Sequence, residues 1–121
     1  MKEPGLDHPI TITDNPHRIR VVLGGFIVAE TTKALTLQEA ALPPVQYIPR
    51  SDVRMDLLER TEHASHCPYK GDATYFRVTA GGLVRDNAGW SYEAPSSAVA
   101  RIREHLAFYP NRVDAIEEFT E

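Results

Sequence analysis

Apolar and polar residues alternate with a period of two over much of the chain, which is the pattern of half-buried β-strands. In residues 18–23, Ile19, Val21 and Leu23 fall on one face. Gly24-Gly25 follows and favours a hairpin turn with positive φ, so residues 26–30 should return as the partner strand. Further strands are expected over residues 10–13, 34–37, 45–48, 73–78, 83–85, 90–92, 107–109 and 113–116.

Two segments have the spacing of short helices. Ser51 can cap a helix over residues 52–59, and Ser96 can cap a second helix nearer the end of the chain. In each segment the apolar residues would share one inward face. The inward positions are Val53, Leu57 and Leu58 in the first helix and Val99, Ile102 and Leu106 in the second.

The order of these elements predicts an α+β, mainly β fold. Many short strands without regular β–α alternation argue against a doubly wound sheet. We expect a single compact domain of antiparallel strands, forming a curled sheet, a sandwich or a partial barrel, with two short helices. The segment 1–9 is rich in proline, glycine and charge and should lie on the surface, whereas residues 10–121 should form the β-rich domain.

Composition narrows the classes of partner. The 121 residues carry a formal charge of −4, and their 13 Lys and Arg residues are scattered, so binding to nucleic acid is not expected. One cysteine cannot form an internal disulfide, which fits a reducing compartment. No stretch approaches the roughly 18 apolar residues that span a bilayer, and the start of the chain lacks the apolar run of a signal peptide. A cytoplasmic location without membrane contact is expected.

The strongest candidate for chemistry is the segment Cys67-Pro68-Tyr69-Lys70-Gly71, called here the Cys67–Gly71 motif. A cysteine reacts as its thiolate, and a nearby cation such as Lys70 or His66 would lower its pKa. Cys67 and Lys70 are therefore the candidate catalytic residues. The alternative, which the sequence favours, is that Cys67 is a small buried apolar residue at the entry to a strand.

Metal binding is not expected at this motif. His63, His66 and Cys67 lie close together in the sequence, but a structural zinc site needs four ligands and the chain has no second cysteine. A catalytic metal site would place the adjacent residues His66 and Cys67 on one ion, which is strained. No metal or other cofactor is assigned.

Other residue types of ligand pockets occur nearby. Trp90 and Tyr92 could form an apolar wall, although aromatic residues also fill the cores of β-rich domains. Tyr75 and Phe76 must face opposite sides of their strand, so only one of them can line a given pocket. Arg50 beside Asp52 could hold a phosphate or carboxylate, or could simply lie on the surface.

Taken together, several segments resemble domain-of-unknown-function family 427, whose small bacterial proteins some collections label nucleotidyltransferase-like. The most specific pieces are Tyr-x-Pro-x-x-Asp-Val at Tyr47–Val53 and Cys-Pro-Tyr-Lys-Gly at Cys67–Gly71. The resemblance implies no particular activity, but it draws attention to the residues within its motifs. They are Tyr47, Arg50, Asp52, Cys67, Tyr69, Lys70, Gly71, Trp90 and Tyr92.

The nucleotidyltransferase label finds little support in the residues. Enzymes of that class typically contain a glycine-rich turn followed by an Asp-x-Asp pair, which holds two metal ions. No such pair follows Gly24-Gly25 or Gly81-Gly82. Asp52 and Asp56 would share one face of the first helix, but no third carboxylate accompanies them.

The sequence therefore favours a domain that binds a small anionic or polar molecule at the Cys67–Gly71 motif; whether it is an enzyme stays open. Lys70 and Arg50 would attract an anionic group. The alternative is a structural or interaction module without catalysis, which forms a homodimer through the edge of its sheet. The expected ligand-binding residues are Tyr47, Arg50, Asp52, Tyr69, Gly71, Trp90 and Tyr92.

Overall fold

Two antiparallel sheets make up the computed structural model, which describes residues 2–120. The large sheet has seven strands in the order β1-β4-β5-β9-β8-β7-β6, and the small sheet has three in the order β10-β2-β3. The strands are β1 (Ile10–Asn15), β2 (Arg18–Leu23), β3 (Phe26–Thr31), β4 (Ala34–Glu39), β5 (Val45–Pro49), β6 (Leu58–Cys67), β7 (Gly71–Ala80), β8 (Leu83–Ser91), β9 (His105–Phe108) and β10 (Ala115–Phe119).

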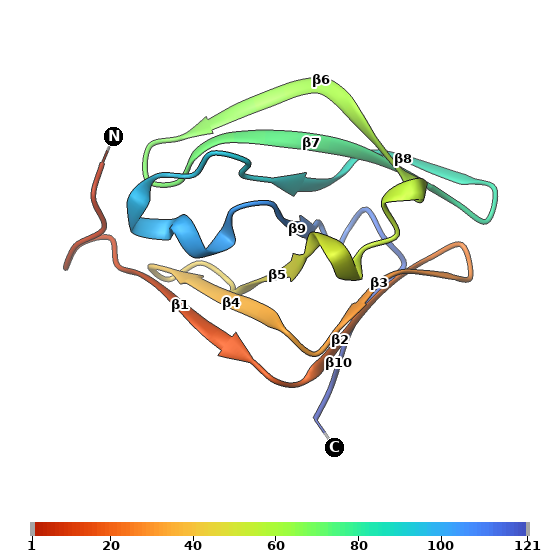
Figure 1. The fold of residues 1–121 in the computed structure, drawn as a ribbon, viewed down its shortest axis with the longest axis horizontal. Coiled ribbons are helices and arrows are strands. Elements are labelled where there is room, and N and C mark those ends of the chain that lie inside the picture. The colour runs from red at the N-terminus through yellow and green to blue at the C-terminus, as the bar shows by residue number, and fades with distance from the viewer. Residues whose placement is uncertain (1, 121) are drawn as a thin grey trace.

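The large sheet is curled but does not close into a barrel. Among residues 2–120, no further strand pairs with the outer side of the edge strands β1 and β6, which lie at opposite margins of the molecule in Figure 1. A short 3-10 helix, η3 (Ser97–Ile102), lies between the part of the sheet that contains β1 and β4 and the part that contains β7 and β8. The mainly β, antiparallel, single-domain architecture expected from the alternating pattern is therefore confirmed.

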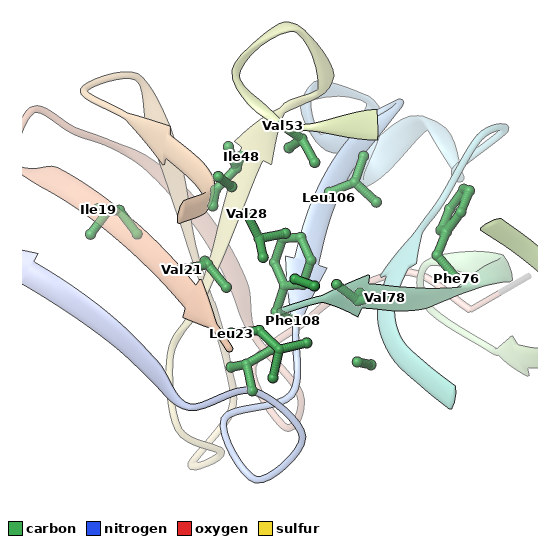
Figure 2. Close-up of a cluster of buried hydrophobic side chains, with 14 of the residues drawn as sticks. Ile19, Val21, Leu23, Val28, Ile48, Val53, Phe76, Val78, Leu106 and Phe108 are labelled. Carbon is green, nitrogen blue, oxygen red and sulfur yellow. The ribbon is translucent and has the colours of Figure 1, made fainter. Parts of the chain in front are cut away.

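Each face of the large sheet contributes to a separate core. Alternation along β7 places Phe76 in the core shared with the small sheet and Tyr75 in the core around η3. Along β5, Ile48 likewise lies in the core shared with the small sheet, and Tyr47 lies in the core around η3. Figure 2 shows the first core, in which side chains of both sheets meet. Its labelled members are Ile19, Val21, Leu23, Val28, Ile48, Val53, Phe76, Val78, Leu106 and Phe108.

The β2–β3 hairpin forms as expected, and its turn touches a second glycine turn. Gly24 and Gly25 have φ values of 60° and 82°. Gly24 lies against Gly81 in the turn between β7 and β8, so that a Cβ on Gly81 would lie 2.0 Å from the Gly24 carbonyl oxygen. Both hairpin tips are on the right of Figure 1. This contact fixes one end of the small sheet to the large sheet.

The prediction of a first helix over residues 52–59 is wrong. Residues 50–57 instead form two 3-10 turns, η1 (Arg50–Asp52) and η2 (Met55–Leu57), and Leu58 begins β6. Two residues of the expected helical stripe reach the core from extended backbone, because Val53 bridges Ala29 and Leu58 pairs with Val78. Pairing with distant strands thus outweighs the local helical spacing.

The second expected helix also has a different form. η3 is a 3-10 helix broken at Val99, whose φ and ψ are −125° and 29°. Ser96 does not cap it, because the Ser96 hydroxyl donates to the Tyr69 carbonyl oxygen over 2.7 Å. Val99 and Ile102 are buried as expected, while Leu106 belongs to β9. Within residues 2–120, no helix has the length and apolar character to cross a membrane.

We expect Gly81→Ala to destabilise the protein more than Gly82→Ala. Both positions have positive φ, 57° and 78°, so both variants carry the left-handed backbone cost of about 1–2 kcal/mol. Only the Gly81 Cβ would overlap the opposing turn, since nothing lies within 4 Å of a Cβ at Gly82. Overpacking should remove about 1–3 kcal/mol more from the free energy of unfolding. Urea unfolding measures the difference, and equal losses would show that the turns are not in contact.

Candidate functional site

The Cys67–Gly71 motif is the turn between β6 and β7. Cys67 ends β6 and pairs with Gly71, the first residue of β7, whose φ of 110° favours glycine. The Lys70 amide donates to the Cys67 carbonyl oxygen over 3.3 Å and closes the turn. This tight turn directs the Lys70 side chain into the protein, where Lys70 is buried.

Lys70 forms an ion pair with Glu39 at the end of β4. Their side chains are 10% and 13% exposed, and the Lys70 ammonium donates to Glu39 Oε1. His8 Nε2 lies 2.8 Å from the other carboxylate oxygen. Burial by itself would raise the pKa of the Glu39 carboxyl, but the hydrogen bonds with Lys70 and His8 hold that pKa below its usual value. Glu39 is therefore ionised at neutral pH.

The ion pair of Glu39 with Lys70 was not predicted from the sequence. Leu35 and Leu37 face the core around η3, and Glu39 follows them at the same period along β4. A carboxylate that continues an apolar face needs a partner, because an unpaired buried charge is costly. The sequence contained this signal, but it did not identify the partner, Lys70, which is 31 residues away.

A cavity of about 140 Å³ lies beside the ion pair. An apolar cavity of roughly this size accommodates one benzene ring. The cavity therefore suits a ring-sized molecule or the head of a larger one. Its walls combine the charged pair with aromatic and aliphatic side chains: Leu37, Glu39, Leu42, Pro43, Val45, Tyr47, Lys70, Tyr75, Trp90, Tyr92 and Tyr109.

Tyrosine hydroxyls supply most of the uncharged polar groups in this cavity. Trp90 Nε1 donates to the Tyr47 hydroxyl over 3.3 Å, and the Tyr75 and Tyr109 hydroxyls are 3.5 Å apart. Burial raises the pKa values of Tyr47 and Tyr92 far above the usual value of 10.0. Burial and the hydrogen bond with Tyr75 raise the pKa of Tyr109 to about 12. The hydroxyls of Tyr47, Tyr92 and Tyr109 therefore keep their protons at neutral pH.

The backbone of the motif also holds neighbouring segments in place. The Ser96 amide donates to the Lys70 carbonyl oxygen over 3.0 Å, and the Lys2 amide donates to the Pro68 carbonyl oxygen over 2.8 Å. The Tyr69 ring stacks on His8 with a centroid distance of 3.9 Å. Tyr69 therefore contacts the segment before β1 and does not line the cavity.

Cys67 has a different environment from the one that an activated thiol requires. It is partly exposed and packs against the core around η3. The two side chains expected to act on it are paired elsewhere, Lys70 with Glu39 and His66 with Asp72 at 2.8 Å. The nucleophilic role of Cys67 stays a prediction to which these contacts add no support.

Arg50 and Asp52 lie outside the cavity. Arg50 Nη1 is 3.5 Å from Glu93 Oε2, and Asp52 Oδ2 accepts a hydrogen bond of 2.7 Å from the Thr31 hydroxyl. The structure thus separates the residues expected to form one pocket. Those that it brings together around the cavity are Tyr47, Lys70, Trp90 and Tyr92.

Residues 2–120 contain no group of three His, Cys, Asp or Glu side chains arranged to hold a metal ion. The two carboxylates considered for metal binding, those of Asp52 and Asp56, have different partners. Asp52 is bonded to Thr31, whereas Asp56 forms an exposed ion pair with Arg54 at 2.8 Å.

Comparison with models of protein families identifies the family of this chain. The model described as a domain of unknown function (DUF427) matches residues 11–118, which is nearly the whole chain. The protein belongs to the DUF427 family. A search of curated proteins found no match. The family's short label refers to nucleotidyl transfer, but its description assigns the DUF427 family no function.

A double-mutant cycle on Lys70 and Glu39 should show strong coupling. Lys70→Met or Glu39→Gln alone should lower the free energy of unfolding by about 3 kcal/mol, because each leaves a buried charge without its main partner. The double variant should lose much less than the sum of the two. The exposed pair Arg54 and Asp56 is the control, and the cycle of Arg54→Met and Asp56→Asn should give a coupling below about 1 kcal/mol.

Glu39 should also contribute to the pH dependence of stability. The pKa of the Glu39 carboxyl is lower in the folded protein than its usual value of 4.5, because Lys70 and His8 donate hydrogen bonds to it. A carboxyl of this kind stabilises the fold above its unfolded pKa, and the contribution disappears as the pH falls through the folded pKa. Between about pH 6 and pH 3, wild type should therefore lose more stability than Glu39→Gln. Urea unfolding at several pH values tests this, and parallel curves would contradict it.

Proposed function

We propose that this DUF427 protein binds a small polar molecule in the cavity beside Lys70. The observation that carries the proposal is the ion pair of the buried Lys70 with the partly buried Glu39, placed at the wall of a cavity of about 140 Å³. Lysine is rarely buried unless it is paired. Apolar walls with a few convergent polar groups are typical of small-molecule sites.

Hydrogen-bond donors in the cavity indicate the chemistry of the ligand. The Tyr47 oxygen accepts from Trp90, while its proton has no acceptor within the described part of the chain. Tyr92 also lines the cavity, and its hydroxyl has no hydrogen-bond partner among residues 2–120. A ligand with an oxygen acceptor would complete these hydrogen bonds.

A neutral acceptor suits the site better than an anion. Glu39 balances the charge of Lys70, so a carboxylate or phosphate next to the pair would also be repelled by Glu39. Arg50, which was expected to help attract an anion, is held by Glu93 outside the cavity. Of the two ligand classes expected from the sequence, we therefore propose the polar one.

The homodimer expected as an alternative would form through a strand at the edge of a sheet. Among the described strands, β6 is the longest edge strand. Its side chains are mostly exposed, and its pairing with β7 is irregular between Arg60 and Ala64. Charged residues and bulges are the features that keep edge strands from pairing with other chains. We therefore favour small-molecule binding over this alternative.

Binding can be tested with benzamide, a ring-sized molecule with a neutral carbonyl oxygen. Trp90 is the only tryptophan in the sequence, so its indole N–H resonance and its fluorescence report on this cavity directly. Benzamide should shift the indole resonance in a saturable manner. Tyr47→Phe and Tyr92→Phe should each weaken binding about three- to tenfold, as expected for one lost hydrogen bond.

Tyr69→Phe is the matched control, since it removes the same hydroxyl outside the cavity and should leave the affinity unchanged. Benzoate should bind more weakly than benzamide because of Glu39. The proposal is wrong if benzamide and benzoate both fail to perturb Trp90, or if Tyr69→Phe weakens binding as much as Tyr47→Phe.

A further inference from the structure

A second and larger cavity adjoins the first. Its volume is about 530 Å³, and it lies between the two sheets, with Ile19 and Val21 of β2 on one side and Ile48 and Phe108 of the large sheet on the other. In Figure 2, Ile19 lies at one margin of the first core, away from Phe76. The remaining walls are Leu42, Pro43, Pro44, Val45, Gln46, Trp90, Tyr109, Pro110 and Ile116.

The cavity occurs where two neighbouring strands separate. β5 pairs with β4 through Val45, Gln46 and Tyr47, but it pairs with β9 only through Ile48 and Pro49. Beyond these two pairs, the start of β5 and the end of β9 are not hydrogen-bonded to each other. Residues on both sides of this separation line the cavity, so the large sheet is open at this point.

The surroundings of this cavity are almost entirely apolar. Gln46 provides its one side-chain amide, and the Gln46 oxygen already accepts hydrogen bonds from Asn15 at 3.1 Å and from the Thr36 hydroxyl at 2.9 Å. A cavity whose walls carry so few polar groups holds water poorly and favours hydrocarbon. It therefore suits the apolar part of a ligand better than its polar part.

Only one layer of side chains separates the two cavities. They share Leu42, Pro43, Val45, Trp90 and Tyr109 as lining residues. Leu42 and Pro43 belong to the loop between β4 and β5, and Leu42 is 54% exposed. A molecule that passes beside these side chains would place one end next to Lys70 and the other end between the sheets.

We propose that the two cavities form one elongated site for an amphipathic molecule. Its neutral polar head lies beside Lys70 and the tyrosine hydroxyls, and its hydrocarbon body occupies the cavity between the sheets. This inference rests on the proposed function, because it takes the cavity beside Lys70 as the site of the head. It adds the class of ligand, which is an uncharged amphiphile with an oxygen acceptor.

A series of primary alkanamides tests the inference, because the head stays constant while the chain grows. Affinities of butanamide, hexanamide and octanamide are measured from the fluorescence and the indole resonance of Trp90. Each methylene that enters the apolar cavity should increase affinity about fourfold. Octanamide should therefore bind roughly a hundredfold or more tighter than butanamide.

Two kinds of variant locate the parts of the ligand. Ile116→Phe places a ring in the apolar cavity only, and it should reduce octanamide affinity at least about tenfold while leaving butanamide and benzamide unchanged. Ile27→Phe is the matched control, because Ile27 is 42% exposed on β3 and lines neither cavity. Tyr47→Phe should weaken every alkanamide by the same factor. Thermal unfolding confirms that each variant is folded.

The outcomes separate this inference from the proposed function. If benzamide binds as proposed but affinity does not rise with chain length, the elongated site is wrong and the cavity beside Lys70 keeps its function. An increase with chain length that Ile116→Phe leaves intact also overturns the elongated site. If chain length matters but Tyr47→Phe and Tyr92→Phe affect no ligand, the head is not beside Lys70 and both proposals are wrong.

Discussion

Burial of the Lys70 ammonium constrains this whole end of the molecule. A buried cation must keep a carboxylate beside it, and Glu39 can serve only if β4, the Cys67–Gly71 turn and the segment carrying His8 hold their positions. The same turn holds the start of η3 through Ser96. The charged pair and the cavity therefore depend on one arrangement, and a change in any of these segments would leave a charge without its partner.

The second constraint is the separation of β5 and β9. β5 pairs with β9 only at Ile48 and Pro49, and the start of β5, which follows Pro43-Pro44, lies apart from β9. The strands accordingly share only a short paired region, and the side chains around the opening, with Trp90 and Tyr109 between the cavities, replace backbone pairing. The first core, which lies between the sheets and is shown in Figure 2, is thus filled by side chains around Phe76 and Val78 but hollow near Ile19.

Local patterns in the sequence predicted most of the strands and their faces, but not β6 (Leu58–Cys67). Ile19, Val21 and Leu23 are all buried, and Tyr75 and Phe76 face different cores as alternation requires. The helices were wrong because a stripe at helical spacing can also be buried from extended backbone when distant strands are available to pair with it. The site was predicted in part: Lys70, Tyr47, Trp90 and Tyr92 do meet, whereas the distances that remove Arg50 and bring in Glu39 arise from the strand order, which a single sequence does not contain.

The contact between Gly24 and Gly81 has a mechanical consequence. Two backbones that touch without side chains between them set the distance between the sheets at this end, where the hairpin tips lie on the right of Figure 1. The sheets are also joined near Ile19, because Asn15 of β1 donates a hydrogen bond to Glu118 of β10, the residue that pairs with Ile19. The width of the cavity between the sheets is therefore set by contacts at both ends of β2.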